Sequence, residues 1–219
     1  TTDKYGYFEV RNAQVLQNAA TVTVNKAGYF KTVKTFIGAA GKSAFFRIKL
    51  LPKTNQGSFD AATGGTVTLT NGLSIVFPAN AVKLAAGGTY TGQVSVAAQW
   101  LDPTAADINR TMPGDLRGID SLGFMRVLTT YGMSATELTG AGGELLQIAD
   151  GKKASITFPL PASISGSAPA TIPLWHFNET IGLWVQEGAA VKTGSTYVGD
   201  VSHFSYWNCD IPNSTVPLT

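Results

Sequence analysis

The sequence predicts an all-β protein built from antiparallel β-sandwiches. Runs of β-branched and aromatic residues, each about one strand long, recur along the 219-residue chain. The 24 glycines and 10 prolines place turn signals between these runs. Almost no segment has the 3.6-residue apolar period of an amphipathic helix. Regularly spaced strands with frequent turns and little helix are typical of sandwiches.

The N-terminal part is expected to hold four strands, followed by a polar stretch. The strands cover residues 5–10, 21–25, 29–37 and 44–51. The stretch from Pro52 to Gly64 is expected to be an interdomain linker, with a crossover loop as the alternative. The resulting organisation is a first sandwich unit at 1–53, a second at 54–210, and a tail or linker at 211–219.

The second unit opens with a hairpin. Residues 66–70 and 73–77 form two alternating runs around Asn71-Gly72, a pair that tolerates positive φ at both positions, as a type I′ turn requires. Short helices are expected at 103–109 and 162–166. Further strands are expected at 89–100, 125–130, 133–139, 153–158, 172–177, 182–187, 196–201 and 203–208.

Composition excludes several classes of protein. The net charge is +2 and no cluster of Lys and Arg occurs, so the sequence does not indicate a nucleic-acid-binding surface. No apolar run approaches the ~20 residues of a membrane-spanning helix, so no membrane span is expected in this segment. The single cysteine, Cys209, excludes an internal disulfide and a cysteine-based zinc site.

Two short motifs near the N-terminus resemble carboxypeptidase regulatory-like domains, which have a transthyretin-like fold. Residues 2–8 match the pattern T-D-x-x-G-x-F, and residues 24–29 match V-x-K-x-G-Y. The opening strands of such a domain are expected before residue 1. The resemblance therefore implies that the first unit is a partial sandwich, incomplete at its N-terminal side.

Residues 58–210 are similar to the β-sandwich domain shared by zonula-occludens proteins and netrin receptors, which is immunoglobulin-like. Gly64-Gly65 and the I-x-x-P-x-x-A segment from Ile75 to Ala81 resemble its opening, and residues 174–188 with 201–210 resemble its closing strands. Exported surface proteins of Bacteroidetes-type bacteria combine these two modules, and cartilage intermediate layer proteins have a related order. The resemblance implies a bacterial extracellular, outer-membrane or periplasmic location, in a lipoprotein or another adhesive surface protein.

The tripeptide His203-Phe204-Ser205 lies in the last expected strand. In some relatives of the netrin-receptor-type domain this tripeptide is a self-cleavage site. The resemblance implies that Ser205 Oγ attacks the Phe204 carbonyl carbon while His203 accepts the hydroxyl proton, and that water hydrolyses the resulting ester. Strand alternation supports the opposite interpretation, since His203 and Ser205 would share a face with Trp207 and no glycine makes a strained turn. Both interpretations stay open.

Metal sites are not strongly predicted. Asp102, Asp107, Asp115 and Asp120 lie in a long connection and are weak candidates for Ca²⁺, although two nearby arginines can pair with them instead. The spacing of the only two histidines fits neither His-x-His nor His-x-x-x-His, so no transition-metal site is expected, and His176 is expected to be a core or edge residue. No cofactor is predicted beyond this calcium hypothesis.

The function predicted from these observations is non-enzymatic. The chain is expected to be a structural, adhesive or binding module of an exported cell-surface protein, with other domains of the same protein as partners. One alternative is a self-cleaving module that cuts between Phe204 and Ser205. The other is a carbohydrate- or peptide-binding module with a protein or glycan ligand, for which the four tryptophans would supply an aromatic platform if exposed.

Overall fold

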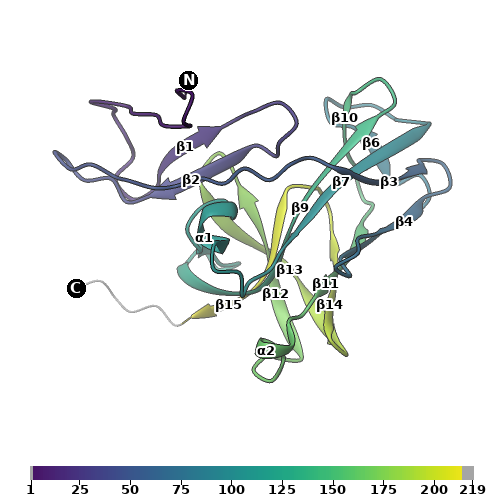
Figure 1. Ribbon diagram of the computed structural model, residues 1–219. Helices are drawn as coiled ribbons and strands as arrows, with labels where there is room; N and C mark the ends of the chain where they lie inside the picture. Colours follow the sequence, from purple (N-terminus) through teal and green to yellow (C-terminus); the bar gives the residue numbers. More distant parts are fainter. Residues whose placement is uncertain (1, 214–219) are drawn as a thin grey trace.

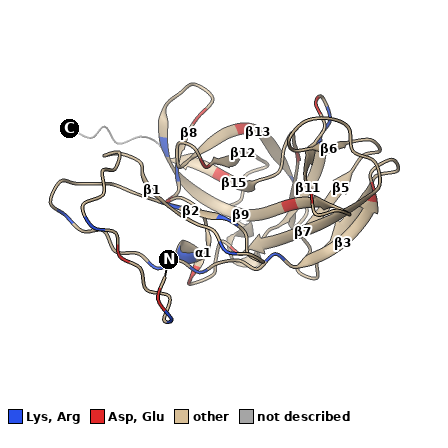
Figure 2. Cartoon of the chain, turned by 90° about the horizontal axis from the view of Figure 1, so that it is seen from above, with Lys and Arg blue, Asp and Glu red and all other residues tan. Residues whose placement is uncertain are grey.

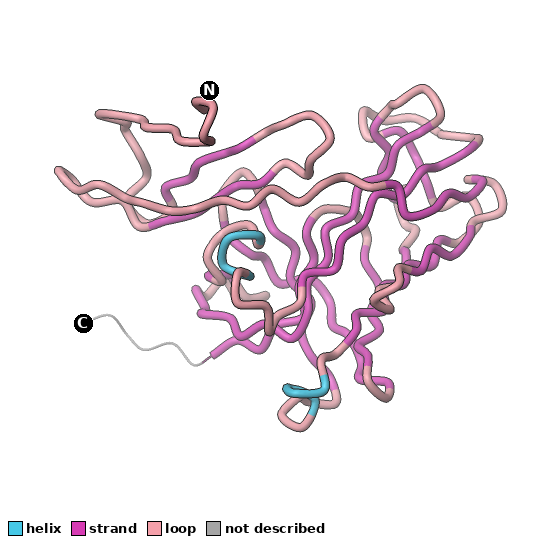
Figure 3. Tube along the Cα trace, viewed as in Figure 1, coloured by secondary structure: helices cyan, strands magenta, loops and turns pink. Residues whose placement is uncertain are grey.

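The computed structural model describes residues 2–213, and the chain is nearly all β, which confirms the predicted fold class (Figures 1 and 3). Two short helices interrupt the strands. Helix α1 (Ile108–Thr111) overlaps the end of the segment expected at 103–109, and α2 (Ala162–Ser165) lies within the segment expected at 162–166.

Thirteen strands form the main sheet. Its principal path runs in the order β3-β7-β9-β15-β12-β13-β14-β11-β5-β4, and β6, β8 and β10 pair beside it. All pairs are antiparallel except β8 with β13. The strands are β3 (Asn55–Asp60), β4 (Gly65–Thr68), β5 (Ser74–Phe77), β6 (Val82–Leu84), β7 (Gln93–Leu101), β8 (Arg117–Ile119), β9 (Met125–Gly140), β10 (Leu145–Ile148), β11 (Ala154–Pro159), β12 (Thr171–Asn178), β13 (Leu183–Thr193), β14 (Thr196–Val201) and β15 (Tyr206–Asn213).

The main sheet folds over on itself around the larger of two apolar clusters. Its first and last strands in the path, β3 and β4, meet at a bridge between Asp60 and Gly64. Phe59 of β3 stacks on Phe77 of β5 with their ring centroids 4.3 Å apart. Strand β11 alternates buried and half-buried residues along its length, as expected of a strand with one face toward a core. The same alternation in the sequence is why this strand was predictable.

The N-terminal segment contains a separate two-stranded sheet, β1 (Ala20–Val24) and β2 (Thr32–Phe36). The strands predicted at 5–10 and 44–51 are wrong, because the chain there is irregular. Their composition favours strands, but no neighbouring strand in the described residues supplies backbone hydrogen bonds to them. Some of their apolar side chains are correspondingly uncovered, with Tyr5 82% and Phe45 80% exposed.

Strand β2 joins the N-terminal segment to the sandwich. The ammonium group of Lys34 is buried and donates to the carbonyl oxygens of Asn109 (2.5 Å) and Met112 (3.0 Å) beside α1. Burial lowers the pKa of Lys34 to about 8, although the carboxylate of Asp115 opposes the shift. Thr35 donates from Oγ1 to the Gly182 carbonyl oxygen at 2.5 Å. These contacts hold β2 against the body of the molecule.

Two local predictions in the second unit need correction. The polar stretch from Pro52 to Gly64, expected as a linker or loop, contains β3, which is held by backbone pairing to β7 and buries Phe59. The hairpin around Asn71-Gly72 forms, but only Gly72 has a positive φ (92°). The turn closes from Gly72 N–H to the Leu69 carbonyl oxygen, so it is not the type I′ turn predicted.

The closing strand also begins later than predicted. Strand β15 starts at Tyr206, and residues 202–205 form a turn after β14. The period-2 argument applied to His203 and Ser205 is therefore wrong, since these residues are not in a strand. At its other end β15 continues to Asn213, and residues 214–219 of the expected tail lie outside the described residues.

Candidate functional site

The turn before β15 is held by the side chain of Gln147 on β10. Its amide oxygen accepts from the Phe204 N–H at 2.7 Å, and its amide nitrogen donates to the Phe204 carbonyl oxygen at 2.8 Å. Trp207 adds a third bond, from Nε1 to the His203 carbonyl oxygen at 2.8 Å. These side chains satisfy backbone groups that a regular strand would pair, which explains how a turn forms here without glycine.

The groups proposed for self-cleavage have other partners. The hydroxyl of Ser205 donates to the Tyr206 carbonyl oxygen at 3.2 Å, and the His203 ring faces Glu187 with its Nε2 3.5 Å from Oε2. The Phe204 side chain is buried in the core. Cleavage between Phe204 and Ser205 stays a prediction.

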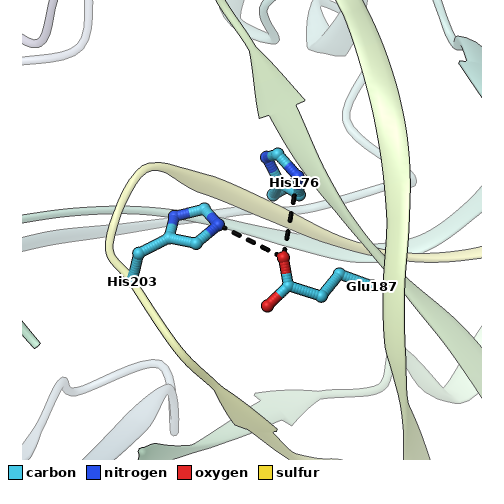
Figure 4. Close-up of side chains that lie close together, drawn as sticks. All are labelled: His176, Glu187 and His203. Atoms are coloured by element: carbon cyan, nitrogen blue, oxygen red, sulfur yellow. Dashed lines mark ion pairs between the residues drawn. The ribbon is translucent and has the colours of Figure 1, made fainter. Parts of the chain in front are cut away.

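Two histidines and one glutamate converge at this turn (Figure 4). His176 comes from β12, Glu187 from β13 and His203 from the turn, and one potential ligand atom from each lies within 4.8 Å of the other two. Glu187 Oε2 is 3.7 Å from His176 Nε2 and 3.5 Å from His203 Nε2. Both rings therefore point at the same carboxylate oxygen.

Strand pairing positions His176 and Glu187. His176 lies opposite Val185 on β13, and Glu187 follows two residues later, so both side chains emerge on one face of the sheet. A register shift follows at once, where Glu187 and Gly188 together oppose Leu174. Gly188 has a φ of +76°, which a residue with a Cβ rarely adopts. This bulge bends β13 next to the cluster, as bulges beside functional sites commonly do.

The cluster is half-buried, and burial favours the neutral form of both imidazoles while the carboxylate of Glu187 opposes it. Burial lowers the pKa of His176, the nearby His203 lowers it further, and Glu187 opposes the shift. Burial likewise lowers the pKa of His203, again against Glu187. The second oxygen of Glu187, Oε1, accepts from the Ser202 hydroxyl at 2.5 Å. The site thus brings together two imidazole rings and one carboxyl group, with Oε2 of that group facing both rings.

The four aspartates of the long connection are dispersed. Each carboxylate has its own polar partner, and none belongs to a group of three converging ligands among the described residues. Calcium binding at these aspartates stays a prediction, and within residues 2–213 their side chains do not converge on a common site. The partners are Thr104 for Asp102 (2.8 and 2.6 Å), Lys49 for Asp107 (2.9 Å), Arg117 for Asp115 (2.7 Å), and Arg126 for Asp120 (2.6 Å).

The histidine cluster was not predicted from the sequence. The spacings His-x-His and His-x-x-x-His describe ligands on one segment, whereas these side chains come from three. The predicted strands 172–177 and 182–187 do contain a usable signal, because pairing them as a hairpin brings His176 close to Glu187. Nothing in the sequence pattern placed His203 beside them.

The tryptophans and charges show no exposed binding platform. Trp175, Trp184 and Trp207 are fully buried, which removes three of the four residues considered for glycan stacking. Acidic and basic residues are interspersed along the described chain (Figure 2). Within residues 2–213, no helix has the length and hydropathy needed to cross a bilayer.

Comparisons with known proteins agree with one of the resemblances. No protein-family model matches the chain. The chain is similar to cartilage intermediate layer protein 2 of Homo sapiens, with 32% identity over 123 residues, which are 56% of this chain and 10% of that protein. The Mus musculus protein of the same name is 29% identical over 162 residues, 70% of this chain and 14% of that protein.

The aligned regions limit what this similarity supports. The chain spans only 10 to 14% of the length of these relatives, so the similarity concerns one part of a much larger protein. It agrees with the resemblance to cartilage intermediate layer proteins. The bacterial origin and the carboxypeptidase regulatory-like module stay predictions.

Proposed function

We propose that the chain is a non-enzymatic structural module of an extracellular protein, which holds neighbouring parts of that protein in a fixed arrangement. The similarity to proteins named for a layer of cartilage carries the extracellular assignment. The more specific location, on a bacterial surface or in the periplasm, rests on the sequence motifs alone.

The attachment of the N-terminal segment supports a structural role. Phe30 and Val33 of this segment are buried in one cluster with Trp175 and Trp184 of the sandwich. Burying such side chains stabilises the contact by roughly 1.5–3 kcal/mol each. The buried Lys34 beside them adds to these contacts, which support an arrangement of the segment and the sandwich as one body.

Distance measurements between spin labels test this proposal. One label on Thr23→Cys, an exposed position of β1, and one on Leu145→Cys, an exposed position of β10, report on the placement of the segment relative to the sandwich. The native Cys209 is fully buried, and burial raises the pKa of its thiol, so it should not be labelled. The matched control pair is Val76→Cys with Leu145→Cys, both within the sandwich.

We expect both pairs to give similarly narrow distance distributions. A broad distribution for the Thr23 pair beside a narrow one for the control would contradict a rigid module, because it would mean that the N-terminal segment moves independently. The chain without introduced cysteines should take up no label.

A further inference from the structure

We propose that His176, Glu187 and His203 bind a divalent transition-metal ion, with zinc as the preferred ion. The proposal begins with the convergence of three side chains from three separate segments (Figure 4). Two imidazoles and one carboxylate are a donor set that zinc uses in proteins. The bound ion would connect the turn before β15 to the hairpin of β12 and β13.

The distances between donor atoms fit one metal ion. Bond lengths of about 2.0–2.2 Å in a tetrahedral site place neighbouring ligand atoms about 3.3–3.5 Å apart. Glu187 Oε2 lies 3.5 Å from His203 Nε2 and 3.7 Å from His176 Nε2. The donor atoms of the two histidines lie within 4.8 Å of each other, so the rings would move closer together to complete a tetrahedral site around one ion.

The ring orientations are set by packing against Trp207. The His203 ring centroid is 5.0 Å and the His176 ring centroid 5.6 Å from that of Trp207, and the two imidazoles are nearly perpendicular with their centroids 4.6 Å apart. Trp207 is fully buried, so it forms a fixed base for both rings. The donors are thus largely placed before an ion arrives, which lowers the entropic cost of binding.

Hydrogen bonds outside the donor atoms complete the arrangement. Ser202 holds Glu187 through Oε1 and leaves Oε2 for the ion. Gln147 fixes the backbone of Phe204, the residue after His203. Such outer contacts orient metal ligands and are a regular part of zinc sites.

The chemistry of the donors selects the class of ion. Calcium takes six to eight oxygen ligands, and this cluster offers only one carboxylate. Imidazole nitrogen suits zinc, copper, nickel and iron instead. The side chains of His203 and Glu187 are 33% and 41% exposed, so an ion can enter from solvent and keep water in the remaining position.

Binding should be measured on the purified chain without a polyhistidine tag, after treatment with a chelator. Titration calorimetry with zinc chloride is expected to show one ion per chain. At a zinc concentration 100-fold above the dissociation constant, the melting temperature should rise by roughly 5–10 °C. The absorption spectrum of bound Co²⁺ gives a second readout, because tetrahedral and octahedral coordination differ in intensity.

Substitutions identify the ligands. Glu187→Gln and His203→Asn should each weaken zinc binding at least ten-fold and, at the same zinc concentration, reduce the rise in melting temperature by about half or more. The matched control is Glu179→Gln, which changes a carboxylate that pairs with Lys31 at the turn of the same hairpin. It should bind zinc as the wild type does. Circular dichroism without metal must show all three variants folded.

Two outcomes would overturn the proposal. One is a wild-type chain that takes up no zinc at millimolar concentration. The other is zinc uptake that Glu187→Gln and His203→Asn leave unchanged while both variants remain folded, because the ion would then bind elsewhere.

Discussion

The segment before β3 and the sandwich that follows it differ in how their apolar side chains are covered. In the segment, Tyr5 and Phe45 are almost fully exposed, and the chain around them is irregular. In the sandwich, Trp184 and Trp207 have no exposed surface and lie in paired strands. The difference shows that strand-forming residues become strands only where a second strand supplies both hydrogen bonds and cover.

Truncating a core tryptophan gives the largest expected effect and tests this contrast directly. Trp207→Ala removes a fully buried ring and should lower the free energy of unfolding by about 3–5 kcal/mol. Phe45→Ala, which removes an exposed ring from the N-terminal segment, should change it by less than about 0.5 kcal/mol. Urea denaturation measures both. Equal losses would mean that the two regions are packed alike.

The connection between the two regions depends on Lys34. Lys34→Met leaves the carbonyl oxygens of Asn109 and Met112 without their donor and should cost about 1–3 kcal/mol. Limited proteolysis should then cut residues 2–53 sooner than in the wild type. Lys42→Met, at an exposed position of the same segment, is the matched control and should behave as the wild type.

The pH dependence of stability gives a further check on Lys34. Its folded-state pKa of about 8 lies below the ordinary value of 10.5, so between these values the unfolded chain holds a proton that the folded chain has lost. This group therefore makes the wild type more stable as the pH rises from about 8 to about 10.5. The difference in stability between wild type and Lys34→Met should grow over this interval, and a constant difference would contradict the burial of the ammonium group.

The buried carboxyl of Asp210 in the closing strand should have a smaller effect on stability, and its effect should lower stability as the pH rises. Asp210 is fully buried, and burial raises the pKa of its carboxyl well above the ordinary value, although the neighbouring Thr130 side chain opposes the shift. The unfolded chain loses this proton first, so stability falls as the pH rises above about 4. Asp210→Asn removes that fall and should be more stable than the wild type by roughly 1 kcal/mol at neutral pH.

Thermal unfolding at pH 4 and pH 7.5 measures the effect of Asp210→Asn. The gain should be larger at pH 7.5. Asp150→Asn is the control, because its carboxylate is almost fully exposed in an ion pair with Lys83. An equal gain at both pH values would contradict the raised pKa of Asp210.

The smallest expected effect concerns the turn before β15. Because the Ser205 hydroxyl donates to the Tyr206 carbonyl oxygen and His203 faces Glu187, wild type and Ser205→Ala should both have the intact mass of the full chain. Mass spectrometry after prolonged incubation measures this. Two fragments from the wild type and one intact chain from the variant would establish the self-cleavage hypothesis instead.

Much of the sandwich was predictable because its strands alternate in the sequence as they do in the structure. Residues 153–158 were expected as a strand, and β11 covers Ala154–Pro159. Prediction failed where long-range contacts decide the local structure. Residues 5–10 and 44–51 lack a partner strand, and the turn at 202–205 depends on Gln147, which lies 57 residues before Phe204 in the chain.

The candidate site could also be predicted only in part from the sequence. The proximity of His176 and Glu187 follows from a hairpin that the sequence does indicate. The position of His203 follows from a turn that the strand pattern concealed, since a run of β-forming residues continues through it into β15. Short-range pattern therefore accounts for two ligands of the cluster and misses the third.

The meeting of β3 with β4 has a consequence for the molecule in a crowded environment. An open sheet presents unpaired N–H and C=O groups at its outer strands, and these groups recruit strands from other chains into aggregates. Here the two outer strands of the main path lie side by side, joined at Asp60 and Gly64. The two strands therefore shield part of each other's open edge at this bridge, which should hinder the addition of a strand from another copy of the chain there.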